Sequence, residues 1–198
     1  MTDYPRVLLD GAEHLRLQAL GTRRLNVGCG LFPLPYWTNL DGDRQAIADH
    51  YATVPPLPFP DGTFDEIYAG HFLEHLTEPE GKRFVAECWR CLVPGGRLGL
   101  VVPDTHEVLI RHLAGTVDCV EHAGVYHAVA DLDAVCRVFF YSTVQASPHR
   151  WSYDLSTLER LLETSGFEVT GEIDRYRDPR LIRGVWYQCG ADARKVAA

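Results

Sequence analysis

The sequence has no apolar run that approaches the length of a membrane-spanning helix, which takes about 20 consecutive residues. Its first six residues also lack the basic and apolar blocks of a secretion signal. These two absences predict a cytoplasmic protein with no membrane span.

Positive charge is scarce as well. The chain has 19 Lys and Arg against 27 Asp and Glu, which gives a formal net charge of −8. Since proteins bind nucleic acid largely through cationic contacts with phosphates, this balance disfavours general nucleic-acid binding. It leaves room for a local basic patch. One candidate is the arginine-rich stretch 174–183, which could bind a phosphate or carboxylate but more often forms a solvated loop.

The six cysteines lack the dense spacing of a disulfide-stapled scaffold. A chain of 198 residues is large enough to need no staples, so reduced thiols are expected. Cys88 and Cys91 form a C-x-x-C, which is typical of a redox pair or of half a zinc site. No second C-x-x-C exists. Because positions i and i+3 are neighbours on a helix, two buried thiols on one helical face are the favoured interpretation.

A third glycine is missing from the most informative segment, Leu25-Asn26-Val27-Gly28-Cys29-Gly30. A short apolar run ends here in Gly-x-Gly, where the absence of Cβ atoms lets the backbone approach a flat ligand. Asp41 follows and can accept hydrogen bonds from a ribose diol. A dinucleotide site needs another glycine where this chain has Pro33, and it expects the acid about 20 residues on. Asp41 comes 13 residues after Gly28, so a nucleotide-like cofactor without a pyrophosphate is predicted.

Apolar segments alternate with helical patterns along the chain, which predicts a parallel sheet with right-handed crossovers. We expect an α/β fold: a Rossmann-like, doubly wound, mostly parallel seven-stranded sheet in a single domain, 1–198. A helical lead-in is expected over 1–23. The helix over 80–91 is expected to end at Pro94-Gly95-Gly96. The expected strands are 24–28, 38–41, 46–51, 66–69, 98–102, 167–173 and 185–189.

The stretch 104–150 is too long for one crossover. It begins where the fifth strand ends, and open α/β sheets bind their ligands at that edge. Helices are expected over 105–113 and 128–141, and five of the nine histidines lie in this stretch. We interpret it as a helical cap insertion over a substrate pocket. The alternative is a packing insertion with solvated histidines.

Three further motifs follow the glycine loop in a recognisable order: Leu57-Pro58-Phe59 through Tyr68, Leu73-Glu74-His75-Leu76, and Leu92-Val93-Pro94-Gly95-Gly96. Together with 156–169 they resemble the class I S-adenosylmethionine-dependent methyltransferases, and most closely the small bacterial predicted-methyltransferase group. The resemblance implies S-adenosyl-L-methionine as cofactor. The implied cofactor-binding residues are Asn26, Val27, Gly28, Cys29, Gly30, Asp41, Gly42, Leu57, Gly70 and His71.

Two positions depart from the family pattern. Asn26 replaces the acid that usually precedes the glycines, so an amide would meet the methionine end of the cofactor without a charge. The acid expected near the adenine is not clearly present. Asp49 is close, but Ala52 holds the likelier register.

The motif His71-Phe72-Leu73-Glu74-His75 has two other interpretations. H-x-x-E-H is an inverted zinc-protease signature, which suggests a metal-dependent hydrolase. Its position just after a strand argues against that. The motif also resembles the Glu-x-x-Glu-His of some O-methyltransferases, in which small-RNA enzymes add a later histidine, here His149, and hold a divalent ion. Since His71 replaces a carboxylate, zinc, iron or nickel would suit the set better than magnesium.

Methyl transfer from a sulfonium needs positioning and exclusion of water more than activation. An oxygen nucleophile must also lose its proton, and histidine suits that role. The candidate catalytic residues are His75, His149 and His106, with Glu74 orienting His75 or binding an ion. We therefore expect O-methylation of a small metabolite, sugar or lipid-like acceptor. The alternative is a non-catalytic protein that keeps the cofactor fold as a partner or regulator.

Overall fold

The computed structural model describes residues 23–116, 119–122, 125–128, 135–136, 148–173 and 187–196. The expected lead-in helix and the arginine-rich stretch 174–183 lie outside these residues. Seven strands form one sheet with the order β3-β2-β1-β4-β5-β9-β8. The strands are β1 (Arg24–Val27), β2 (Thr38–Asp41), β3 (His50–Tyr51), β4 (Phe64–Gly70), β5 (Leu92–Pro103), β8 (Phe167–Glu172) and β9 (Gln188–Lys195).

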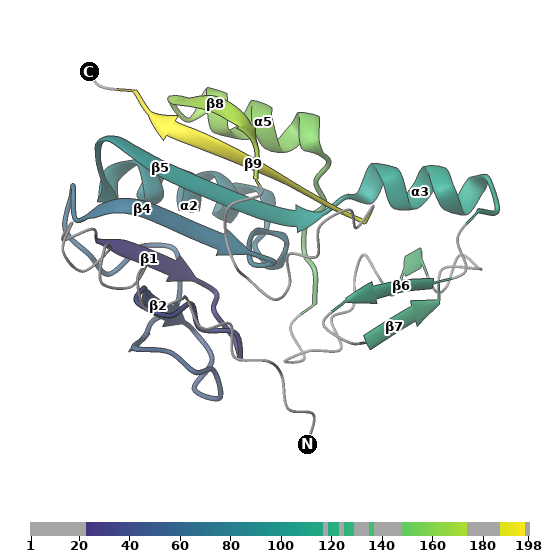
Figure 1. The fold of residues 1–198 in the computed structure, drawn as a ribbon, viewed down its shortest axis with the longest axis horizontal. Coiled ribbons are helices and arrows are strands. Elements are labelled where there is room, and N and C mark those ends of the chain that lie inside the picture. Colours follow the sequence, from purple (N-terminus) through teal and green to yellow (C-terminus); the bar gives the residue numbers. More distant parts are fainter. Residues whose placement is uncertain are drawn as a thin grey trace, which may run out of the picture.

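The first five strands are parallel, and β9 runs antiparallel to both β5 and β8. This confirms the predicted α/β fold with a mostly parallel seven-stranded sheet. The carboxyl ends of β1, β4 and β5 point to the same edge, toward helix α3 (Thr105–Leu113) and a small hairpin (Figure 1). Ligands of parallel sheets bind at that edge, because the loops after the strands meet there.

Helices α2 (Glu78–Cys91) and α5 (Leu155–Thr164) pack against one face of the sheet. Each begins with a side chain that accepts a backbone N–H: Glu80 accepts from Thr77 at 2.8 Å, and Asp154 accepts from Thr157 at 2.7 Å. Such caps satisfy donors that the first helical turn leaves open. The apolar faces of these helices and of the central strands form the main core.

Cys88 and Cys91 lie in that core and are fully buried, as predicted for two thiols on one helical face. Burial raises the pKa of both thiols. Among the described residues, no helix combines the length and the apolar character needed to span a bilayer.

Several element boundaries differ from the prediction. The strand expected over 98–102 begins at Leu92, directly after α2, so Pro94-Gly95-Gly96 lies inside β5 rather than at a helix end. The third strand is shortened to two residues, and the last strand begins at Gln188 instead of 185. β5 is longer than predicted because Leu92 already pairs with Phe64 of β4. The register of the two strands then shifts between Phe64 and Glu66.

The insertion holds a helix and a hairpin. Its first predicted helix is confirmed as α3. Strands β6 (Cys119–His122) and β7 (Val125–Ala128) then form an antiparallel pair that was not predicted. Of the helix expected over 128–141, residues 135–136 are described, and they are helical, whereas Ala128 belongs to β7.

Candidate functional site

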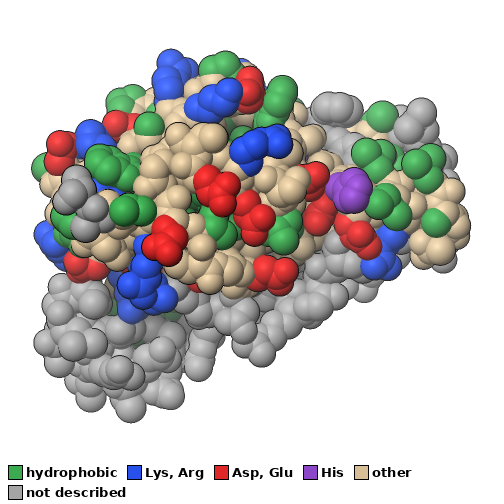
Figure 2. All heavy atoms as spheres, turned by 90° about the horizontal axis from the view of Figure 1, so that it is seen from above, with side chains coloured by type: hydrophobic (Ala, Val, Ile, Leu, Met, Phe, Trp, Pro, Cys, Tyr) green, Lys and Arg blue, Asp and Glu red, His purple; other side chains and the backbone are tan. Residues whose placement is uncertain are grey.

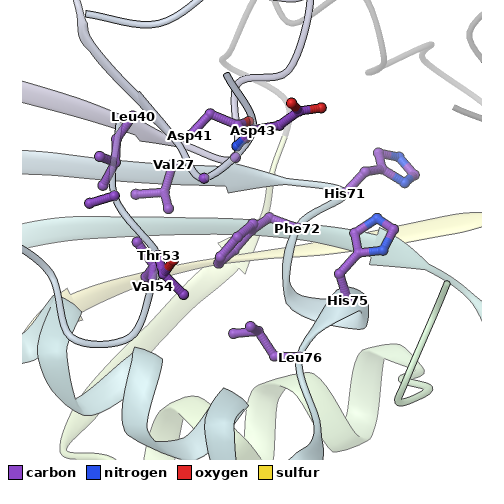
Figure 3. Close-up of a pocket in the computed structure, with 13 residues that line it drawn as sticks. Val27, Leu40, Asp41, Asp43, Thr53, Val54, His71, Phe72, His75 and Leu76 are labelled. Atoms are coloured by element: carbon purple, nitrogen blue, oxygen red, sulfur yellow. The ribbon is translucent and has the colours of Figure 1, made fainter. Parts of the chain in front are cut away.

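A cavity of about 370 Å³ opens at the carboxyl edge of the sheet. The segments that follow β1, β2, β3 and β4 form its walls (Figure 3). Its lining residues are Val27, Gly28, Leu40, Asp41, Gly42, Asp43, Ala52, Thr53, Val54, His71, Phe72, His75 and Leu76. The cavity therefore includes five of the ten predicted cofactor-binding residues and one predicted catalytic histidine.

Gly28 makes the turn that leaves β1 for the cavity. Its φ of 68° lies in the left-handed region, and a Cβ added there would collide with the ring of Phe72. Only glycine adopts this conformation without strain and also leaves room for the aromatic ring. The turn at Gly28 therefore packs directly against the ring of Phe72 on one wall of the cavity.

Asp41 ties the glycine loop to the end of β2. Its Oδ2 accepts the N–H of Gly30 at 2.7 Å, and its Oδ1 accepts the N–H of Asp43 at 2.8 Å. A carboxylate has about four lone-pair positions, so two remain for a ligand hydroxyl pair. Asp41 both builds the loop and offers an acceptor at the cavity wall.

The remaining predicted cofactor residues lie off the cavity wall. Asn26 is buried, and its Nδ2 donates to Oδ1 of Asn39 at 3.0 Å. Neighbouring strand residues face opposite sides of a sheet, so Asn26 points away from the side where Val27 meets the main core. Asp49 is also engaged elsewhere, since its Oδ2 accepts the N–H of Asn39 at 2.8 Å.

The other four predicted cofactor residues contact the segments around the cavity and do not line it. The Cys29 thiol reaches the carbonyl of Ile47 at 3.5 Å, and Gly30 donates to Asp41. Leu57 is buried, and its N–H donates to Glu87 at 3.0 Å. Gly70 ends β4, in register with Val101.

Some lining residues escaped the sequence analysis. Asp43 follows Asp41 by two positions, and the segment 52–54 follows the third strand. Their places just after strand ends would have been enough to predict that they line the cavity. Phe72 and Leu76 flank the predicted motif. Their apolar side chains resemble ordinary core residues, and only the fold shows that they line a cavity.

His71 stands where β4 ends and has a φ of 50°. Its backbone N–H donates to the carbonyl of Val101 at 2.9 Å. Its Nδ1 lies 3.3 Å from Oε1 of Glu74, and its Nε2 lies 3.1 Å from Oε1 of Gln188. The ring therefore bridges the turn after β4 and the start of β9.

Glu74 is the most buried acid of the site, with a residue exposure of 2%. Burial raises its pKa, but the interaction with His71 and the nearby charges of His71, His75 and His149 outweigh burial and lower the pKa to about 2. Glu74 is thus a fixed negative charge at neutral pH.

His75 and His149 meet beside this carboxylate. Their ring centroids are 4.9 Å apart, edge to face. Nδ1 of His75 lies 3.3 Å from the carbonyl oxygen of Pro148. The carbonyl oxygen of Glu74 accepts the N–H of Arg150 at 2.7 Å, which anchors the segment that carries His149. His75 and Pro148, which are 73 positions apart in the sequence, are brought into contact in this way.

Glu74, His75 and His149 each offer one ligand atom within 4.8 Å of the others. Two imidazoles and one carboxylate suit a transition metal better than magnesium, so the set fits the kind of ion that the motif suggested. The same three groups also fit a base supported by a carboxylate. His106, the third candidate base, is exposed on α3 and is neither in this cluster nor among the cavity-lining residues.

Comparisons with known proteins agree on the fold. A family model described as a methyltransferase domain matches residues 37–100. The ubiquinone/menaquinone biosynthesis C-methyltransferase UbiE of Escherichia fergusonii is 30% identical over 123 residues, which are 59% of this chain and 44% of that protein. The chain therefore spans less than half the length of this curated relative.

Two solved structures are similar over nearly their whole length. An S-adenosylmethionine-dependent methyltransferase from Aquifex aeolicus is 18% identical, with a TM-score of 0.55, and the match covers 98% of this chain and 95% of that one. Another from Methanosarcina mazei is 18% identical, with a TM-score of 0.57 and coverage of 96% and 99%. At these identities the likeness concerns the fold.

Proposed function

We propose that this chain, which belongs to the class I S-adenosylmethionine-dependent methyltransferases, methylates a hydroxyl oxygen of a small metabolite, sugar or lipid-like acceptor. One observation carries the choice of oxygen. An ionised, buried Glu74 lies beside the His75–His149 pair, and His75 lines the cavity. A hydroxyl acceptor must lose a proton, and this cluster is built to receive one.

The cavity has the features that the cofactor requires. Gly28 and Phe72 pack together on one wall of the cavity, and Asp41 offers carboxylate oxygens to a ribose diol. Apolar side chains of Leu40, Val54 and Leu76 cover other parts of the wall. When bound, the cofactor supplies a sulfonium whose methyl carbon is ready for in-line displacement.

The protein's own part is to hold the acceptor and to take its proton. A carbonyl oxygen only accepts hydrogen bonds, so the contact with Pro148 places a proton on Nδ1 of His75. Nε2 is then the basic nitrogen when the ring is neutral. Nε2 would take the proton of the acceptor hydroxyl as the methyl carbon passes from the cofactor sulfur to oxygen and S-adenosylhomocysteine is left, and Glu74 would stabilise the resulting imidazolium. His149 packs against the same ring.

The insertion 104–150 is proposed to cover this cavity. Helix α3 leaves the sheet at Asp104, just past the carboxyl end of β5, and the insertion returns at 148–151 against Glu74. On the face that Figure 2 shows, basic and acidic side chains are interspersed.

Incubation with methyl-labelled S-adenosylmethionine and a cell extract tests the proposal. A labelled product with the methyl group on oxygen is expected. His75→Ala and His149→Ala should each lower turnover by about 10²–10⁴-fold and leave cofactor affinity nearly unchanged. His106→Ala is the matched control and should retain turnover.

Carbon is the second candidate acceptor atom, because the relative from Escherichia fergusonii is a C-methyltransferase. A methyl group on carbon in the labelled product would decide for it. If cofactor binds but no extract yields a labelled product, the non-catalytic alternative gains.

A further inference from the structure

Gln188 contributes to the site from the far end of the chain. It is the first residue of β9, in register with Pro103 of β5. The backbone carbonyl of the neighbouring Tyr187 accepts the N–H of Asp104 at 2.7 Å. This bond fixes the start of β9 against the end of β5. From this position the side-chain oxygen of Gln188 lies 3.1 Å from Nε2 of His71. The two residues are 117 positions apart in sequence.

His71 has an unfavourable backbone conformation, and its ring is held by contacts at both nitrogens. A φ of 50° lies in the left-handed region, which a residue with a side chain adopts only where the surroundings enforce it. The His71 side chain is 6% exposed, and both ring nitrogens face an oxygen. The ring orientation is therefore set by Glu74 on one side and Gln188 on the other.

Gln188 and Glu74 hold the His71 ring from opposite ends. Oε1 of Gln188 lies 3.1 Å from Nε2, and Oε1 of Glu74 lies 3.3 Å from Nδ1. A ring that is engaged at both nitrogens cannot turn without losing a contact. Without the amide of Gln188, the contact of Nδ1 with Glu74 would have to hold the ring without this support.

The orientation of Glu74 depends on this support. Its backbone carbonyl anchors Arg150 and Trp151, but these bonds do not orient the carboxylate. Among the described residues, neither Oε1 nor Oε2 of Glu74 makes a hydrogen bond. The approach of His71 Nδ1 to Oε1, at 3.3 Å, is the polar contact that favours this position of the carboxylate beside His75 and His149.

We propose that Gln188 is a positioning residue, which holds the His71 ring so that His71 keeps the Glu74 carboxylate aligned with His75 and His149. This role rests on the proposed function, because it serves the proton transfer assigned to that pair. Gln188 touches neither acceptor nor cofactor in this assignment and acts through His71 alone.

Nitrogen-15 NMR of the histidine rings tests the hydrogen-bond part without any acceptor. The unaltered protein, Gln188→Leu and Gln188→Glu are compared at pH 7, with the His71 signal assigned by its loss in His71→Phe. In Gln188→Leu, the Nε2 signal should shift, because the amide oxygen 3.1 Å away is removed. In Gln188→Glu, a carboxylate oxygen replaces the amide oxygen, so the Nε2 signal should stay closer to that of the unaltered protein. Identical His71 spectra in all three proteins would overturn the proposal.

Turnover on the labelled acceptor from the extract tests the functional part. Gln188→Leu should lower turnover on the order of tenfold, a fraction of the 10²–10⁴-fold that acid–base catalysis contributes, while KM for the cofactor stays within about twofold of the unaltered value. Gln188→Glu should restore most of the turnover. A change confined to KM, or no rescue by glutamate, would refute the positioning role. Failure of the proposed function is seen separately, as no product from the unaltered protein, and the spectra then decide alone.

Discussion

Replacing Glu74 with glutamine should flatten the acid limb of the protein's stability curve. Glu74 is buried, and its pKa is lowered from 4.5 to about 2. A carboxyl group whose pKa falls on folding stabilises the folded state above its unfolded pKa and loses that contribution as the pH drops through its folded pKa. The contribution of Glu74 is therefore full above about pH 4.5 and is lost toward pH 2.

The size of the effect follows from the same two values. Each pKa unit corresponds to 1.36 kcal/mol, so the lowering from 4.5 to about 2 amounts to about 3 kcal/mol of unfolding free energy. Glutamine has no proton to lose and removes this pH-dependent contribution. The difference in stability between the unaltered protein and Glu74→Gln should shrink by about 3 kcal/mol between pH 6 and pH 2.

Urea unfolding, followed by tryptophan fluorescence at half-unit pH steps, measures this difference. Glu163→Gln on α5 is the control, because Glu163 is exposed and does not belong to the cluster of Glu74, His75 and His149. Curves for the unaltered protein and Glu74→Gln that run parallel from pH 6 to pH 2 would show that Glu74 is not held ionised by its histidine neighbours. That result would also remove the support for its role beside His75.

Further predictions concern the cofactor, the ion and the insertion. Asp41→Ala should weaken binding of S-adenosylhomocysteine in calorimetry by about 1.5–3 kcal/mol, and equal affinity would remove Asp41 from the site. Gly28→Ala should add roughly 1–3 kcal/mol of backbone strain and displace Phe72, which lowers the melting temperature by about 2–4 °C per kcal/mol; an unchanged melting curve would contradict the assigned turn. Removal of metals with EDTA should leave turnover unchanged, and a loss that zinc restores would favour the metal interpretation of the cluster. Hydrogen exchange over 104–150 should slow when cofactor product is added, and protection confined to 24–75 would make the insertion structural.

Much of the cavity wall was readable from sequence because its residues are close neighbours in the chain. Gly28 and Asp41 lie at the ends of successive short strands, and such ends meet at one edge of a parallel sheet. The position of Asn26 shows where this reasoning stops. Its place beside the glycines suggested a cofactor contact, but strand alternation turns its side chain to the opposite face, toward Asn39.

The sequence by itself determined the class of fold and the order of its elements, because hydrophobic period, glycine turns and helix caps are local properties of the chain. The tertiary structure decided which chemical groups meet. Contacts between His75 and Pro148 and between His71 and Gln188 join residues 73 and 117 positions apart. No local pattern encodes such pairs, since they form only when helices and strands pack into one sheet. The hairpin β6–β7 was missed for a related reason, because its two short strands form a separate two-stranded sheet by pairing with each other, in a stretch where no element was predicted before residue 128.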